Sequence, residues 1–163
     1  MKEKMRVCIG FGQDSHAFDE GNLEKKCVIG GVIIEDSPPF AADSDGDIIL
    51  HAMCNAITSL THIPILGGVA IELCKSGITD SRIYLEEALQ TLSSQKIQHV
   101  SLSIEGKRPR LQSRCDQIRT KVAEILSIQA NQVGLTITSG DGLTAFGRGE
   151  GMQCICLITA IKD

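Results

Sequence analysis

The stretch Met152-Gln153-Cys154-Ile155-Cys156-Leu157-Ile158-Thr159-Ala160-Ile161 is nearly continuous in apolar side chains. Such a run is typical of a strand that is covered on both sides, so we expect it to be central in its sheet. Cys154 and Cys156 fit this strand as small buried hydrophobes better than as a redox pair. The fold should therefore be organised around a sheet with this segment inside it.

Further strands are expected over residues 6–11, 28–34, 99–104 and 133–137, which are rich in apolar or alternating residues. The first two should form an antiparallel pair, with Gly30-Gly31 as a bulge or a point of close backbone approach. Apolar residues at helical spacing predict helices over residues 43–60, 80–92 and 111–125, the second capped by Asp80. Residues 61–77 contain Pro64 and Gly67-Gly68 and are expected to be a loop with at most a short helical turn, a candidate lid.

These elements predict an α+β fold, with one mixed β-sheet and helices packed on one face. Its 163 residues are expected to form a single domain, 1–163. The other face of the sheet is expected to be partly apolar and must be shielded from water. Further copies of the same chain are the simplest way to bury it, so we expect a homo-oligomer.

The composition limits the function. A net charge of -4 and an aromatic content of 3% argue against a nucleic-acid binder or a protein that binds membrane surfaces. The 7 cysteines have no secreted-domain spacing, and neither a signal peptide nor a membrane-spanning stretch is apparent, so we expect a cytoplasmic protein without disulfides.

Two segments hold residues that can bind a metal. Asp14 and His16 would share one face of a strand, and His51 follows Asp47 by one helical turn. We expect Asp14, His16 and His51 to hold Zn2+ with a fourth position open to a substrate oxygen, while Asp47 orients the His51 ring. Taken singly, these are ordinary loop residues and a helix-start acid, but the presence of both segments favours a metal site.

The segment Gly147-Arg148-Gly149-Glu150-Gly151 could bind a phosphate through backbone N-H groups and the guanidinium. A flexible glycine loop explains this segment equally well. Thr138 and Ser139 offer hydroxyls at a strand end, and Arg108-Pro109-Arg110 could hold a nucleotide by its fixed backbone.

Taken together, Asp14-Ser15-His16, Ser44-Asp45-Gly46-Asp47 with Leu50-His51, Asp80-Ser81-Arg82, Pro109-Arg110 and residues 147–151 resemble the 2-C-methyl-D-erythritol 2,4-cyclodiphosphate synthase family. The resemblance implies a homotrimer with active sites between subunits, one Zn2+ per subunit on Asp14, His16 and His51, and a second divalent ion, Mg2+ or Mn2+, on the substrate diphosphate. It also implies closure of 4-diphosphocytidyl-2-C-methyl-D-erythritol 2-phosphate to a cyclic diphosphate, with release of CMP.

The resemblance also assigns roles to residues. Ser139 and Asp43 would be catalytic, with Ser139 donating a hydrogen bond to the phosphate, and Arg148 would add positive charge. The segments 105–112 and 138–141 match the cytidine-binding segments of the family. The residues expected to bind substrate are Asp14, His16, Asp43, Ser44, Gly67, Pro109, Arg110, Thr138, Ser139, Asp141 and Arg148.

Two departures from the family pattern leave other functions open. Asp43 stands where the family usually has a histidine, and the loop at residues 65–74 retains little besides Gly67. One alternative is a non-catalytic trimer that binds zinc and a nucleotide, and another is a zinc-dependent hydrolase of a different phosphoester.

Overall fold

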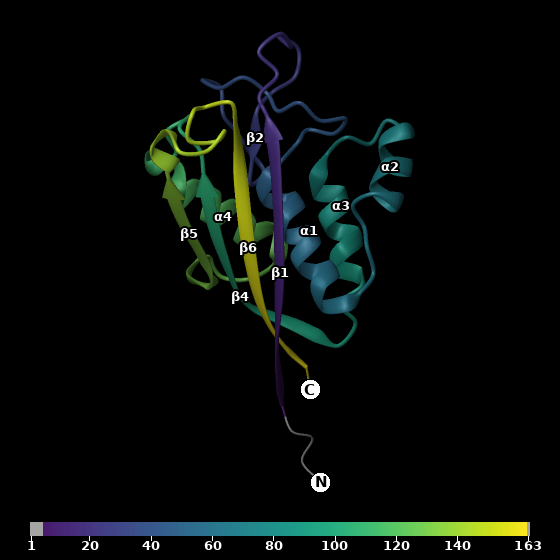
Figure 1. The fold of residues 1–163 in the computed structure, drawn as a ribbon. Coiled ribbons are helices and arrows are strands. Elements are labelled where there is room, and N and C mark those ends of the chain that lie inside the picture. Colours follow the sequence, from purple (N-terminus) through teal and green to yellow (C-terminus); the bar gives the residue numbers. More distant parts are fainter. Residues whose placement is uncertain (1–4, 163) are drawn as a thin grey trace.

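The computed structural model describes residues 5–162, and its main feature is a four-stranded mixed sheet (Figure 1). The strand order is β1 (Arg6–Ala17), β6 (Gly151–Lys162), β4 (Gln95–Glu105) and β5 (Val133–Thr138). Strand β6 runs antiparallel to both β1 and β4, whereas β4 and β5 are parallel. The apolar segment that the sequence analysis starts from is therefore an inner strand, as predicted.

The helices cover one face of this sheet (Figure 1). Helix α1 (Ile48–Thr61) packs on β1 and β6, α3 (Ser81–Gln90) packs on α1, and α4 (Cys115–Leu126) packs on β5. Asp80 caps α3 through its side chain, as predicted. Short 3-10 turns occur at Gln112–Arg114, Ala130–Gln132 and Gly140–Gly142.

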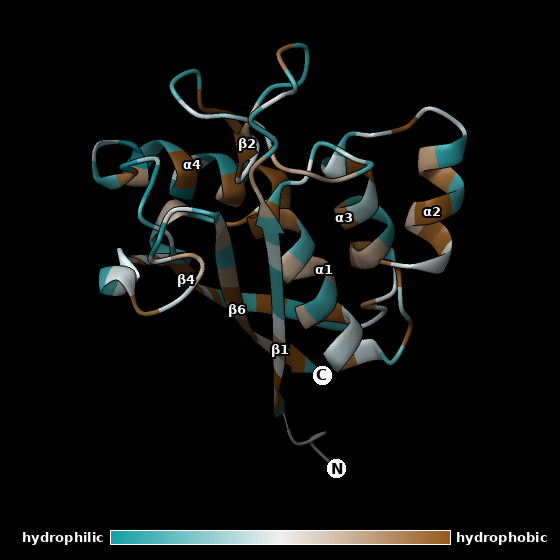
Figure 2. Cartoon of the chain, turned by 45° about the horizontal axis from the view of Figure 1, so that its top comes forward, coloured by the Kyte–Doolittle hydropathy of each residue, from teal (hydrophilic) through white to brown (hydrophobic). Residues whose placement is uncertain are grey.

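The predicted loop at residues 61–77 contains a helix of 8 residues, α2 (Gly68–Lys75). The prediction of at most a short helical turn was therefore wrong. Gly67, read as a chain breaker, is the residue before this helix and has a positive φ of 95°. Figure 2 shows α2 at the edge of the molecule, away from the sheet, with hydrophobic and hydrophilic residues on its surface.

The expected pairing of residues 28–34 with residues 6–11 was wrong. Strand β1 pairs with β6 over its whole length, while β2 (Val28–Ile29) and β3 (Val32–Ile33) form a separate two-stranded hairpin. Gly30 and Gly31 make the hairpin turn with φ values of 61° and 75°, which glycine adopts without steric cost.

Glycines let β1 lie unusually close to α1. A Cβ atom on Gly10 or Gly12 would collide with backbone atoms of α1, at the carbonyl oxygens of Ala56 and Ala52 respectively. This close approach brings the end of β1 beside the first turn of α1. It therefore decides which side chains of the two elements can meet.

The face of the sheet opposite the helices carries exposed apolar side chains. They come from alternate positions of β1 and from its neighbour β6, and are Val7, Ile9, Phe11 and Leu157, exposed by 58%, 63%, 53% and 38%. Phe11 lies directly across from Leu157 in the sheet, so these residues form one surface. Among the described residues, no helix has the length and apolar character needed to span a bilayer.

Candidate metal centre and substrate pocket

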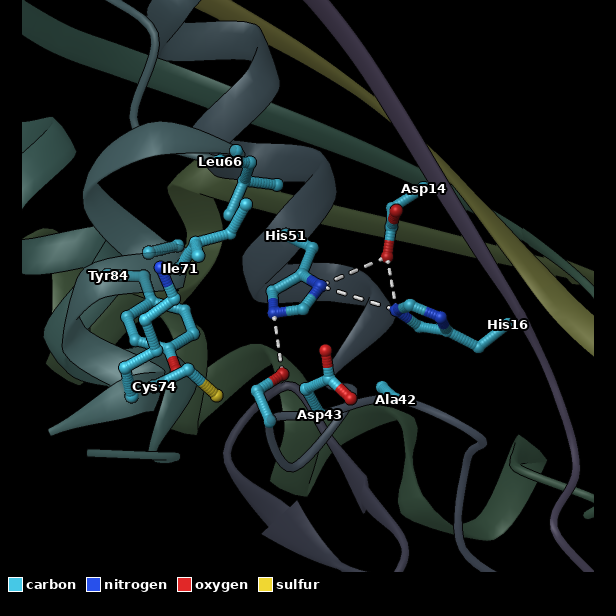
Figure 3. A pocket seen from close by; sticks show the side chains of 13 residues that line it. Asp14, His16, Ala42, Asp43, His51, Leu66, Ile71, Cys74 and Tyr84 are labelled. Carbon is cyan, nitrogen blue, oxygen red and sulfur yellow. Dashed lines mark hydrogen bonds and ion pairs between the residues drawn. The ribbon is translucent and has the colours of Figure 1, made fainter. Parts of the chain in front are cut away.

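Asp14, His16 and His51 meet at one point of the structure (Figure 3). Asp14 Oδ2 lies 2.9 Å from His16 Nε2 and 3.2 Å from His51 Nδ1, and these two nitrogens are 3.3 Å apart. One ligand atom from each residue can be chosen so that all three lie within 4.8 Å of one another. The predicted convergence of a carboxylate and two imidazoles is confirmed.

Secondary structure explains why these three side chains meet. Asp14 and His16 are alternate residues of β1 and point to the same side, and His51 lies one turn into α1. Because β1 packs closely on α1 at Gly12, the chain brings two strand ligands against one helix ligand. All three side chains are largely shielded from solvent.

The electrostatics of the group suit a cation. Burial raises the pKa of the Asp14 carboxyl, but interactions with the neighbouring imidazole rings, first of all His16, outweigh it, so the net pKa is lowered. An ionised carboxylate beside two imidazole nitrogens is a donor set that a borderline-soft divalent ion accepts.

Asp47 does not orient the His51 ring, which corrects the sequence expectation. Its side chain is fully buried and accepts the N-H groups of Ile49 and Leu50 as the N-cap of α1, and those of Gly30 and Gly31 from the hairpin turn. Asp47 therefore ties the β2-β3 hairpin to the start of α1.

The second nitrogen of His51 faces a serine instead. His51 Nε2 lies 2.8 Å from Ser81 Oγ, and Ser44 Oγ is 3.4 Å away. The Ser81 hydroxyl in turn donates a short hydrogen bond to Asp45. Sequence reasoning missed this contact, although Ser81 directly follows the predicted cap residue Asp80.

Aromatic rings support the other histidine. Phe40 is fully buried, stacks on Phe18 at 5.3 Å and lies 6.1 Å from the His16 ring. The Arg108 guanidinium lies over the Phe18 ring, 4.7 Å from its centre. A row of contacts thus connects the turn before Pro109 to a residue of the metal group.

The metal group forms one wall of a cavity of about 670 Å3, a size that suits a small-molecule ligand. Asp43, Ser44 and Gly67, which were predicted to bind substrate, also line it. Leu66, Ile71, Cys74 and Tyr84 lie on the other side of His51 from Asp14 and His16, so this wall is mostly apolar (Figure 3). Ile71 and Cys74 belong to α2, as does Ala70, which also lines the cavity. Helix α2 therefore closes one side of the pocket.

A lysine balances the acidic residues near this cavity. The Lys25 ammonium donates hydrogen bonds of 2.8 Å to the carbonyl oxygens of Phe40 and Ala42, directly before Asp43. Burial lowers the pKa of Lys25, although Asp45, Asp19 and Asp43 act in the opposite direction. This lysine was not singled out from the sequence.

A second, separate pocket gathers residues predicted to bind phosphate and nucleotide. Ser139, Asp141 and Arg148 line it together with Lys107. Arg148 is half exposed and paired with Glu150, and the Ser139 hydroxyl donates to Asp141 at 2.9 Å. Of the other predicted residues, Arg110 and Thr138 are exposed while Pro109 is buried.

Among residues 5–162 of one chain, none is shared between this second pocket and the cavity at the metal group. The structure of a single chain thus brings Asp14, His16, Asp43, Ser44, His51 and Gly67 together, and Ser139, Asp141 and Arg148 together elsewhere. The two sets of predicted site residues do not meet.

The sequence of this chain is similar to that of a known family. The model of the YgbB family matches residues 7–161. The 2-C-methyl-D-erythritol 2,4-cyclodiphosphate synthase of Chlamydia muridarum is 49% identical over 94% of this chain and 88% of its own length, and that of Chlamydia caviae is 51% identical over 94% and 89%.

The fold is also found among solved structures. A Plasmodium falciparum protein solved as a CDP complex superposes with a TM-score of 0.79, covering 96% of this chain and 97% of that one. The two sequences are 22% identical, so this similarity concerns the fold alone.

Proposed function

This chain belongs to the YgbB family, and on that basis we infer that it is an enzyme that forms 2-C-methyl-D-erythritol 2,4-cyclodiphosphate, the product for which its curated relatives are named. The substrate is 4-diphosphocytidyl-2-C-methyl-D-erythritol 2-phosphate, an intermediate of non-mevalonate isoprenoid synthesis. The observation that carries this function is the Asp14, His16 and His51 group on the wall of a ligand-sized cavity.

The reaction is an intramolecular phosphoryl transfer. An oxygen of the 2-phosphate forms a bond to the β-phosphorus, and the bond from that phosphorus to the oxygen shared with CMP breaks, so that CMP leaves with the bridging oxygen. No water is consumed, which makes the enzyme a phosphorus-oxygen lyase. Because the nucleophile is already an anion, the chain must supply orientation and neutralise charge rather than act as a base.

Asp14, His16 and His51 fit a zinc ion by the chemistry of their donors, one carboxylate oxygen and two imidazole nitrogens. When bound, zinc would supply a Lewis acid for the diphosphate oxygens. The chain contributes the orientation of these three ligands, and it shields them from water.

Asp43 and Ser139 are the two residues that we assign to the reacting diphosphate. Asp43 is exposed on the cavity wall beside the metal group, where its carboxylate can hold the second divalent ion, Mg2+ or Mn2+, that accompanies the diphosphate. Ser139 carries a hydroxyl that can donate to a phosphate oxygen. Ser44 and Gly67 line the same cavity and would contact the erythritol phosphate end.

The cytidine end of the substrate is assigned to the second pocket. Arg148 and Lys107 supply positive charge there, and Thr138 and Asp141 belong to the turn at the end of β5. Pro109 and Arg110 lie in the turn after β4, in which the Lys107 N-H donates a hydrogen bond to the Phe146 carbonyl. Backbone groups can read the base in this turn, consistent with the few aromatic residues of the chain.

A homotrimer would join the two pockets. The pocket with Ser139 and Arg148 does not share a lining residue with the metal cavity of its own chain, and β1 and β6 expose an apolar surface that none of the described helices covers. We propose that this surface associates around a three-fold axis, so that the second pocket of one subunit completes the metal cavity of its neighbour.

The function is tested by 31P NMR of the products formed from the named substrate. We expect cyclic diphosphate and CMP in equal amounts, loss of both after zinc removal with a chelator, and recovery when zinc is restored. A linear product containing oxygen from water would identify a hydrolase instead, and tight binding of CDP without CMP release would identify a non-catalytic binding protein.

A further inference from the structure

We propose that Asp45 and Ser81 are positioning residues that commit His51 to bind the metal ion through Nδ1. The proposal rests on the metal site assigned above and extends it to two residues that do not belong to the ligand set. It follows from the number of hydrogen atoms available between three side chains.

The Ser81 hydroxyl has only one hydrogen to donate. Ser81 Oγ contacts Asp45 Oδ1 and also lies 2.8 Å from His51 Nε2. An ionised carboxylate accepts and cannot donate, so the hydroxyl hydrogen points to Asp45. The contact with His51 must then be donated by the ring, which places a proton on Nε2.

A neutral imidazole with a proton on Nε2 has its free lone pair on Nδ1. Nδ1 is the nitrogen that faces Asp14 Oδ2 at 3.2 Å and His16 Nε2 at 3.3 Å. The hydrogen bond on one side of the ring thus prepares the other side for a cation. The opposite tautomer would direct N-H at the metal position.

Asp45 is itself held as an acceptor. Its Oδ1 also accepts the Asp47 N-H at 3.1 Å, and its Oδ2 accepts the Ser81 N-H at 3.1 Å. Its own N-H donates to the Thr79 carbonyl at 2.9 Å. These bonds connect the segment before α1 to the start of α3, so the orientation of the His51 ring depends on how two helices are joined.

We call the two hydrogen bonds from His51 through Ser81 to Asp45 the relay. Burial leaves its members few alternative partners. The Ser81 side chain is fully buried and His51 is 7% exposed, so water has little access to replace a lost partner. Ser44 has a second hydroxyl near His51 Nε2, but its Oγ is 3.4 Å away. This oxygen also accepts the Gly46 N-H. Ser44 is therefore the natural control for Ser81.

The tautomer can be read directly from metal-free protein. The chain has 4 histidines, so two-bond 1H-15N correlation spectra of 15N-histidine-labelled protein resolve each ring. At about pH 8, above the ordinary titration range of imidazole, we expect His51 to carry its proton on Nε2. A proton on Nδ1 in the unaltered protein would overturn the proposal.

Variants test whether the relay causes this preference. Ser81→Ala and Asp45→Asn should each weaken Co2+ or Zn2+ affinity by about 10- to 100-fold and alter the visible spectrum of the cobalt-loaded protein. Ser81→Ala should also give His51 a mixture of tautomers, and adding Asp45→Asn to it should cause little further loss. Ser44→Ala should change affinity by less than either.

Unchanged affinity and an unchanged His51 spectrum in folded Ser81→Ala or folded Asp45→Asn protein would contradict the relay. Because tautomer and metal affinity are measured without substrate, this failure is distinct from a failure to form cyclic diphosphate. If Ser81→Ala does not fold, Asp45→Asn and the tautomer of the unaltered protein decide the question.

Discussion

Asp14 Oδ2 lies 3.2 Å from His51 Nδ1, although the two residues are 37 positions apart in the chain. A strand and a helix that are distant in sequence therefore build a single ion site. This contact is the point at which the fold and the proposed chemistry depend on each other.

Loss of either residue should remove that site. Asp14→Ala and His51→Ala each leave two of three protein ligands, so we expect tight zinc binding to be abolished together with CMP release. Competition with a chromophoric zinc chelator and a CMP-release assay measure the two effects. His62→Ala, an exposed histidine at the end of α1 and outside the apolar face of the sheet, is the matched control; full activity in either ligand variant would refute the site.

The approach of β1 to α1 should be sensitive to a single methyl group. In Gly12→Ala the new Cβ would collide with backbone atoms of α1 at Ala52 and Ala56, which cannot move aside as a flexible side chain would. We expect the free energy of unfolding, measured by urea denaturation, to fall by about 3 kcal/mol. Gly21→Ala, in a loop with open space around it, should change it little, and equal effects of the two variants would exclude this packing argument.

The buried carboxyl of Asp47 should make stability depend on pH. Burial raises the pKa of Asp47 to about 6, although the N-H groups of Gly31, Gly30 and Leu50 favour its ionised form. Between about pH 4 and 6 the folded protein then holds a proton that the unfolded chain has released, so the free energy of unfolding should decrease as pH rises through this range.

Chemical denaturation of metal-free protein at several pH values measures this effect. The free energy of unfolding of the unaltered protein, taken relative to that of Asp47→Asn, should decrease across this range, because the asparagine side chain does not ionise. Parallel profiles for the two proteins would contradict the raised pKa.

The apolar face of the sheet should control assembly. Phe11→Glu places a charge on the surface formed with Ile9 and Leu157, so we expect a monomer by light scattering, with zinc binding retained and CMP release lost. Leu23→Glu changes a side chain that is 94% exposed in a loop and should leave the assembly intact. A Phe11→Glu protein that remains a trimer would rule out this face as the interface.

The metal group could be predicted from the sequence because each of its ligands stands at a position that the spacing within one strand or one helix determines. Asp14 and His16 are alternate residues of a strand, and His51 lies near the start of a helix with clear apolar spacing. The alternative reading of Asp47 as a helix-start acid is confirmed, since it is the N-cap of α1. Its bonds to Gly30 and Gly31 could not be predicted, because those residues belong to a hairpin placed by tertiary packing.

The strand pairing and the hydrogen bonds from His51 through Ser81 to Asp45 could not be predicted either, because they also depend on tertiary packing. Nothing local distinguishes β6 from residues 28–34 as the partner of β1, since both are apolar segments. Ser81 meets His51 across 30 positions only because α3 packs on α1. Helix α2 was missed because Gly67 was interpreted as a helix breaker, whereas it is the residue directly before the first turn of the helix.

The most direct test of the account is zinc-edge X-ray absorption spectroscopy of the protein loaded with one zinc ion per chain. The account predicts two imidazole nitrogens and oxygen donors at about 2.0 Å around the zinc, without sulfur, and loss of one imidazole in His51→Ala. A zinc ion coordinated by cysteine sulfur at about 2.3 Å, or an unchanged spectrum in His51→Ala, would contradict it.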